Sequence, residues 1–119
     1  MAEHLRHGGC HCGAVRYQVE VDLDQPATAC NCSMCGRAGW NLVFVGAAKF
    51  KLEQGDANLT DYRFNSHVIH HVFCKTCGIK AFARGTNAKG EAVVAINVRT
   101  IDDIDVFAIS TKRSDGRSR

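Results

Sequence analysis

The chain has 119 residues, 45% of them hydrophobic, so its size and composition are those of one globular domain and argue against disorder. Its net charge of +3 lies in the last eight residues, which argues against a nucleic-acid partner, because such proteins carry basic residues along a face. No segment approaches the ~20 apolar residues that span a bilayer, and the N-terminus lacks the apolar stretch of a signal peptide. We therefore expect a cytoplasmic protein with no membrane partner.

The order of apolar residues and glycines predicts β-strands joined by turns. Alternation over residues 15–21 indicates a half-buried strand, and a loop with the single proline follows at 22–26. The apolar run at 42–45 is typical of a buried strand, and weaker patterns predict strands near 50–52, 59–64, 68–73, 79–83 and 91–98. A hairpin turn is expected at 87–90.

No segment shows a sustained helical period, and only residues 100–103 suggest a brief helical turn, which Thr100 would cap. There is no repeat and no linker. We therefore predict a single, mainly β domain over residues 1–119, with small β-sheets around zinc-binding loops. The basic tail, 112–119, is expected to be solvated or to pack as an irregular terminus.

Seven cysteines form two pairs and a triplet, which is the strongest functional signal in the sequence. In a reducing cytoplasm such clusters indicate metal or redox sites rather than disulfides. Four thiolates close a structural zinc site, whereas three leave one position open, as a catalytic zinc does. The grouping therefore predicts two Zn²⁺ ions with different roles.

The two pairs fit a structural zinc site made by Cys10, Cys12, Cys74 and Cys77. Each pair lies beside glycines, in a turn whose backbone N–H groups can donate to the sulfurs. A metal there would contribute on the order of 10–16 kcal/mol of apparent binding energy to folding. The alternative is a set of buried free thiols, since cysteine is often a small core residue. A redox pair at Cys74 would need a βαβ pattern, which is not seen.

The triplet, Cys30, Cys32 and Cys35, fits a catalytic zinc with water or substrate in the fourth position. Three thiolates make the metal a weaker Lewis acid than three histidines would, so a soft ligand such as a substrate thiol is favoured. Two alternatives stay open at this point. Two of the thiols could form a redox disulfide, or a second structural site could take a fourth ligand from His67, His70 or His71.

The residues around the cysteines are less informative. Trp40 and Asn41 follow the triplet and are candidates to line a pocket, although tryptophan is more often a core residue. Arg37 could meet a substrate carboxylate, but an exposed arginine is the default. His11 is expected to point outward.

Three segments resemble the glutathione-dependent formaldehyde-activating enzyme family, also called S-(hydroxymethyl)glutathione synthases. They are residues 9–17 (GCHCGAVRY), 30–35 (CNCSMC) and 73–78 (FCKTCG), and residues 97–99 and 115–118 are similar to the family's end. The resemblance implies an Mss4-like fold, a structural zinc on the two pairs and a catalytic zinc on the triplet. The chain departs from the family in having Asn31 where histidine is frequent, and in being shorter than the founding enzymes.

The resemblance also implies an activity. The chain would be a zinc-dependent carbon–sulfur lyase-like enzyme that joins or cleaves a glutathione-like thiol and a small carbonyl such as formaldehyde, with Cys30, Cys32 and Cys35 as its catalytic residues. This agrees with the preference of a three-thiolate zinc for a thiol. Two other functions remain: a non-enzymatic zinc-binding module, and a thiol redox sensor that uses an empty triplet.

Overall fold

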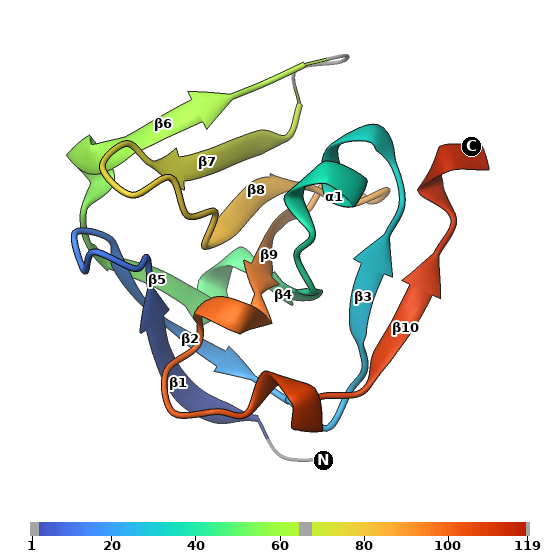
Figure 1. Ribbon diagram of the computed structural model, residues 1–119, viewed down its shortest axis with the longest axis horizontal. Coiled ribbons are helices and arrows are strands. Elements are labelled where there is room, and N and C mark those ends of the chain that lie inside the picture. The colour runs from blue at the N-terminus through green and yellow to red at the C-terminus, as the bar shows by residue number, and fades with distance from the viewer. Residues whose placement is uncertain (1–2, 65–67, 119) are drawn as a thin grey trace.

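The computed structural model describes residues 3–64 and 68–118, which form two β-sheets around a common core (Figure 1). The smaller sheet has the strand order β1-β2-β5, and the larger has the order β10-β3-β4-β9-β8-β7-β6. The strands are β1 (His4–Gly9), β2 (Arg16–Val21), β3 (Ala27–Cys30), β4 (Leu42–Gly46), β5 (Phe50–Gln54), β6 (Leu59–Tyr62), β7 (His70–Cys74), β8 (Phe82–Thr86), β9 (Ala92–Asn97) and β10 (Thr111–Ser114). The prediction of a mainly β fold of small sheets is confirmed.

Helical structure is scarce in the described ranges. The α-helix α1 (Ser33–Ala38) contains Cys35, and the remaining pieces are 3-10 turns: η1 (Ala47–Lys49), η2 (Asp56–Asn58), η3 (Val98–Thr100), η4 (Val106–Ala108) and η5 (Gly116–Ser118). None of these helices is long and apolar enough to span a membrane.

The main core lies between the two sheets and centres on three aromatic rings. The Phe50 ring lies 5.6 Å from the ring of Tyr17 and 4.7 Å from that of Phe82, centroid to centroid. Tyr17 can be fully buried because its hydroxyl hydrogen-bonds with Thr100 Oγ1 at 2.8 Å, and burial raises its pKa to about 12. Cys10 and Cys74 belong to the same core, which therefore fixes two of the predicted metal ligands in place.

A second apolar cluster lies on the other face of the larger sheet. Side chains alternate along β4, so Val43 and Val45 pack into the main core while Leu42 packs with Trp40, Ala83 and Ala95. α1 covers part of this cluster through Cys35 and Ala38, but the neighbouring Phe44 side chain is 59% exposed. This second face of the sheet is thus only partly covered.

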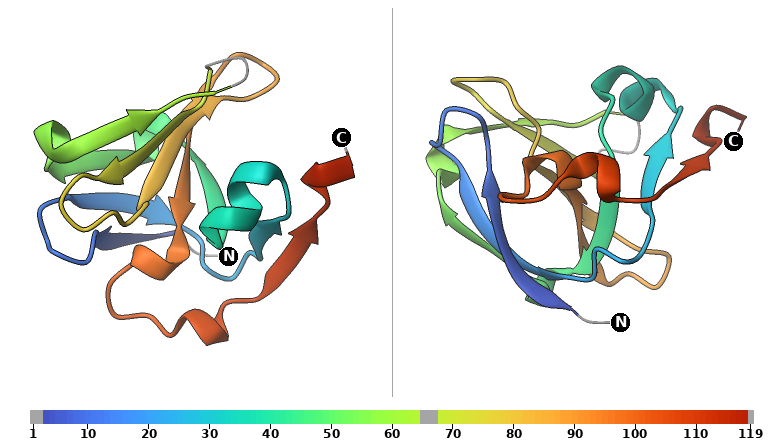
Figure 2. Two further views of the ribbon diagram at one scale, coloured as in Figure 1. Left: turned by 45° about the horizontal axis from the view of Figure 1, so that its top comes forward. Right: turned by 60° about the horizontal axis from the view of Figure 1, so that its bottom comes forward.

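The C-terminal residues differ most from the prediction. Most of these residues are exposed, as expected of a solvated tail, but the segment is not irregular: Thr111–Ser114 form β10, which pairs with β3 in parallel and places Ser114 opposite Cys30. Figure 2 shows these two strands side by side at the edge of the molecule, next to α1. The sequence prediction failed here because parallel pairing of distant segments leaves no local turn signal.

Several other elements were predicted well or only shifted. The hairpin at 87–90 is closed by the Asn87 N–H, which donates to the Glu91 carbonyl at 3.0 Å. The strands expected at 59–64, 68–73 and 79–83 are displaced by up to three residues, as β6, β7 and β8. Thr100 does not cap a helix: η3 ends there, and Asn97 caps it by accepting from the Arg99 N–H at 3.2 Å. β1, β3 and α1 were not predicted.

Candidate metal centres

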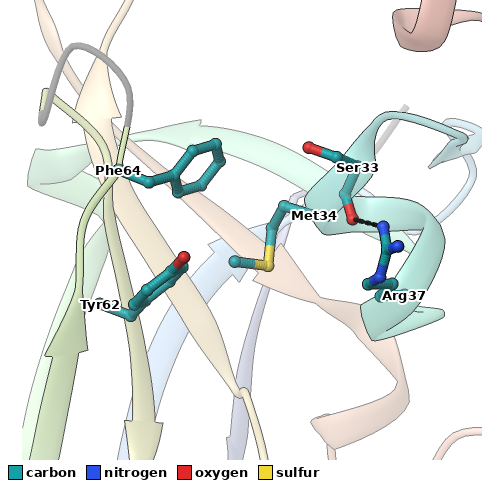
Figure 3. Close-up of a pocket in the computed structure, with 5 residues that line it drawn as sticks. All are labelled: Ser33, Met34, Arg37, Tyr62 and Phe64. Atoms are coloured by element: carbon teal, nitrogen blue, oxygen red, sulfur yellow. Dashed lines mark hydrogen bonds between the residues drawn. The ribbon is translucent and has the colours of Figure 1, made fainter.

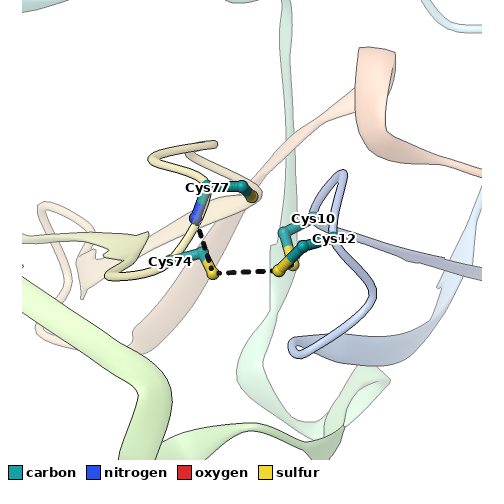
Figure 4. A group of neighbouring side chains, drawn as sticks. All are labelled: Cys10, Cys12, Cys74 and Cys77. Carbon is teal, nitrogen blue, oxygen red and sulfur yellow. Dashed lines mark hydrogen bonds between the residues drawn. The ribbon is translucent and has the colours of Figure 1, made fainter.

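The first cysteine cluster joins two turns that are far apart in the sequence. Cys10 and Cys12 lie in the turn between β1 and β2, whereas Cys74 ends β7 and Cys77 lies in the turn that follows (Figure 4). Glycines with left-handed backbone follow both pairs, Gly13 at φ +86° and Gly78 at φ +80°, a conformation that other residues rarely adopt. The glycines thus make the tight turns that bring the four sulfurs together.

The sulfur positions fit a tetrahedral metal site. All four Sγ atoms lie within 4.8 Å of one another, and Cys12 Sγ is 3.6 Å from both Cys10 Sγ and Cys74 Sγ. Sulfurs at the corners of a tetrahedron with zinc–sulfur bonds of 2.3 Å would lie about 3.8 Å apart, whereas disulfide sulfurs lie about 2.05 Å apart. The cluster therefore has the spacing of metal ligands rather than that of a disulfide.

Polar hydrogens surround these sulfurs, as thiolate ligands require. The Val15 N–H donates to Cys10 Sγ at 3.3 Å, and the Asn58 side-chain amide donates to Cys74 Sγ at 3.1 Å. The Cys77 backbone N–H is the main cause that lowers the pKa of Cys74 to about 6, against the opposing effect of burial. Cys74 is thereby prepared as a thiolate, the form that binds metal. Asn58 was not predicted from sequence, because its contact depends on η2 meeting the end of β7.

The triplet is assembled locally, at the junction of β3 and α1. Cys30 ends β3, Cys32 is the N-cap of α1, and Cys35 lies in its first turn. Their three Sγ atoms all lie within 4.8 Å of one another, so one ion can contact all three. The convergence that the spacing of residues 30, 32 and 35 predicted is therefore present in the structure.

The electrostatics of the triplet favour one thiolate in particular. Burial tends to raise the pKa of Cys32, but hydrogen bonds from the backbone N–H groups of Cys35 and Met34 outweigh it, so the pKa is lowered. The Cys35 backbone N–H donates to Cys32 Sγ at 3.3 Å. Burial raises the pKa of Cys35 to about 11, although the nearby indole N–H of Trp40 acts in the opposite direction. A metal ion would have to supply the charge that makes all three sulfurs thiolates together.

A fourth protein ligand for the triplet is not found in residues 3–64 and 68–118. No histidine, cysteine or carboxylate there joins the three sulfurs within 4.8 Å. Of the candidates, His70 is engaged with Asp61 at 2.7 Å, and His71 lines the same pocket as Cys30 and Cys35 but is not part of the group whose ligand atoms lie within 4.8 Å of one another. His67 lies outside the described residues.

Comparisons with known proteins identify the family of the chain. The family model of the glutathione-dependent formaldehyde-activating enzyme matches residues 5–113, which include both cysteine clusters. The chain belongs to this family. A crystal structure of a Rhodobacter sphaeroides protein is similar, with 29% sequence identity and a TM-score of 0.80 over 90% of this chain and 97% of that one. The resemblance inferred from the sequence is thus confirmed.

In this family member the C-terminal segment lies directly against the triplet. The Asn31 side-chain amide donates to Asp115 Oδ1 at 3.0 Å, and its oxygen accepts from the Arg117 N–H at 2.9 Å. A Cβ atom at Gly116 would lie 2.6 Å from Cys30 Sγ, so the backbone of residue 116 forms a wall of the site. The sequence composition indicated only that this tail is basic. Its single indication of function was the similarity of residues 115–118 to the C-terminal part of the family's sequences.

Two open pockets meet the triplet from opposite faces of the β3–β10 pair. One, of about 490 Å³, contacts Cys30 and Cys35 and is lined mainly by apolar side chains, Trp40 among them. The second pocket, of about 460 Å³, contacts Cys30, and its lining contains more polar and charged side chains: Ala29, Cys30, Asn31, Arg113, Ser114 and Asp115. Trp40 is therefore both a core residue, at 3% exposure, and a pocket residue.

A third hollow lies on the other side of α1. It measures about 280 Å³ and lies between the helix and the end of β6, lined by Ser33, Met34, Arg37, Tyr62 and Phe64 (Figure 3). The exposed Arg37 guanidinium donates to the Ser33 carbonyl at 3.1 Å. Asn41 lines a different hollow, of about 160 Å³, where its side-chain oxygen accepts from Arg99 Nε at 2.7 Å. His11 is exposed as expected.

Proposed function

We propose that the chain is a zinc-dependent carbon–sulfur lyase-like enzyme that joins or cleaves a thiol such as glutathione and a small carbonyl such as formaldehyde. Membership of the formaldehyde-activating family supports an enzymatic role. The observation that carries the proposal is the triplet, in which three sulfurs converge beside open pockets without a fourth ligand from the described residues.

We assign the two clusters different roles. Cys10, Cys12, Cys74 and Cys77 would hold a structural zinc, because they join distant segments and two of them are part of the core. Cys30, Cys32 and Cys35 would hold a catalytic zinc, which when bound makes the proton of a substrate thiol easy to lose. The whole chain, residues 1–119, would act as one domain in a reducing cytoplasm.

The chain's own residues position the reactants. The N–H groups at the start of α1 stabilise the thiolate of Cys32, and the Trp40 indole lies against Cys35. The pocket walls hold both reactants together, which lowers the entropic part of the barrier. The substrate sulfur gives up its proton and forms a bond to the carbonyl carbon, while the C=O π pair moves to the oxygen, which takes a proton. No electrons are exchanged with a third molecule.

The proposal can be tested by exchange NMR with ¹³C-labelled formaldehyde and glutathione, because the adduct also forms without a catalyst. Zinc-loaded protein should accelerate the exchange, and the variant Cys32→Ser should not. If the zinc-loaded protein gives no acceleration, the chain is a non-enzymatic zinc-binding module. If the metal-free protein instead forms a reversible disulfide within the triplet, the redox sensor replaces the enzyme.

A further inference from the structure

We propose that the thiol used by this site carries an apolar body, and that this body lies in the apolar pocket beside the triplet rather than in the second pocket, which Arg113 and Asp115 line. The proposal rests on the proposed function in one respect: it takes the triplet to be the place where a substrate thiol reacts. It goes further by narrowing the class of that thiol from thiols in general to those with an apolar body, so that glutathione becomes the poorer of two possible substrates.

The pocket's lining is the first observation. Its walls come from the partly covered face of the larger sheet and are mostly apolar: Trp40, Leu42, Phe44, Ile69, Ala83 and Ala95. Phe44 is 59% and Ile69 48% exposed, so large apolar side chains stand at the rim with nothing covering them among the described residues. A ligand that fills the pocket would remove this surface from water, which stabilises the complex by about 25 cal/mol for each Å² of apolar surface buried.

The charges around the pocket are the second observation. Among the described lining residues, Lys112 is the one permanently charged side chain and no carboxylate is present. Glutathione carries two carboxylates and an ammonium group at neutral pH, and a charged group that leaves water without a partner is strongly disfavoured. The pocket therefore suits a thiol whose body is uncharged, or carries a single anionic group that can reach Lys112.

Access to the sulfurs is the third observation. Both Cys30 and Cys35 line this pocket, whereas the second pocket touches only Cys30 of the three. Lys112 lines the apolar pocket and Arg113 and Asp115 line the second one, while Cys30 and Ser114 border both. A thiol that meets the triplet from the pocket can contact two of its sulfurs, and its body then lies against the apolar wall.

The size of the pocket agrees with this assignment. A volume of about 490 Å³ is far more than formaldehyde needs, and it falls within the range of about 300–1,000 Å³ that is usual for small-molecule sites. A phenyl or short alkyl group attached to the reacting sulfur would fill part of it. We therefore take benzyl mercaptan as the probe of this class.

The test compares benzyl mercaptan with glutathione in the exchange NMR assay, with formaldehyde as the common carbonyl. We expect kcat/KM to be higher for benzyl mercaptan. Phe44→Ser should lower this value about five- to tenfold, since part of the apolar wall is lost. Phe107→Ser is the matched control, because Phe107 is 87% exposed and does not line the pocket. Arg113→Ala, in the second pocket, should lower this value less than Phe44→Ser does.

Two outcomes would overturn the inference: a preference for glutathione, or sensitivity to Arg113→Ala with none to Phe44→Ser. A binding measurement separates this failure from failure of the proposed function. Benzyl alcohol has neither thiol nor carbonyl, and Trp40, the single tryptophan, reports its binding through fluorescence. A shift that Phe44→Ser abolishes supports the apolar site even if neither thiol is turned over, and absence of any shift in the wild type contradicts it.

Discussion

The two cysteine clusters use the same side chain in opposite ways. The four-cysteine cluster joins segments that are 62 residues apart, and both Cys10 and Cys74 are buried in the core. The triplet comes from residues 30–35 alone, its sulfurs are only partly buried, and two pockets reach it. The comparison teaches that connectivity and access, rather than the ligand type, separate a site that holds the fold together from one that can take a substrate.

The largest difference should appear when one cysteine is removed from each cluster. Cys74→Ser should unfold the domain, because the metal energy of about 10–16 kcal/mol is as large as the whole stability of a typical domain, about 5–15 kcal/mol. Cys32→Ser should leave the domain folded but inactive. Circular dichroism with thermal melting measures both, and equal collapse of the two variants would remove the division of roles.

A smaller and more selective effect is expected at Gly116. In Gly116→Ala the new Cβ would lie 2.6 Å from Cys30 Sγ and 3.1 Å from Cys32 Cβ. Overpacking of this kind typically costs about 1–3 kcal/mol, which would weaken metal binding at the triplet by about 5- to 150-fold and spare the other cluster. Gly46→Ala is the control, since nothing lies within 4 Å of its new Cβ. Competition with a chromogenic chelator should show one weakened zinc, and two unchanged zincs would contradict the account.

The converse selectivity is expected at Asn58. Asn58→Ala removes the amide donor to Cys74 Sγ, and loss of a residue that supports a metal ligand typically costs 10–100-fold in affinity. We expect the zinc affinity of the four-cysteine cluster to fall about tenfold, with no change at the triplet. Thr76→Val is the control, because it removes the 3.2 Å bond between Asn58 and Thr76 but leaves the contact with sulfur. The same chelator competition measures the effect. Weaker zinc binding at the triplet would contradict this prediction.

The smallest effect concerns the ion pair between Arg16 and Asp102, which lies beside the turn of Cys10. The hydrogen bond from Arg16 lowers the pKa of Asp102 below its ordinary 3.8. Because the pKa of Asp102 is lower in the folded state than in the unfolded state, its ionised carboxylate stabilises the fold at pH values above the unfolded-state pKa. This contribution is lost as the pH falls through the folded-state pKa. Because both side chains are partly exposed, at 31% and 41%, Asp102→Asn should cost under about 1 kcal/mol.

Urea unfolding of the zinc-loaded protein, from pH 7 down to the lowest pH at which it still holds its zinc, tests this pair. The difference between wild type and Asp102→Asn should shrink toward the acid end, while the zinc content at pH 7 stays at the wild-type value. A difference that grows as the pH falls would have the wrong sign.

The sequence was most informative where function depends on local spacing. The positions of Cys30, Cys32 and Cys35 were sufficient to predict their convergence, because a strand end and one helical turn keep them together. The alternating strand that became β2 and the apolar run that became β4 were likewise predicted, since their side chains pack on opposite faces.

The sequence was least informative where distant segments meet. β3 and β10 have few strongly β-forming residues, and their parallel pairing depends on where the chain returns after η4. The contacts of Asn31, Asp115 and Gly116 around the triplet follow from that pairing, so they could not be predicted without it. The apolar pocket was missed for the same reason, because residues from β3, β4, β7, β8, β9 and β10 line it together.

The most direct test of the central claim is native mass spectrometry of the zinc-loaded protein with and without an added thiol. The account predicts two bound zinc ions and a thiol adduct on the wild type, and one zinc ion without adduct on Cys32→Ser. Two zinc ions that resist chelation equally and bind no thiol would contradict it, because the triplet would then be a second closed structural site.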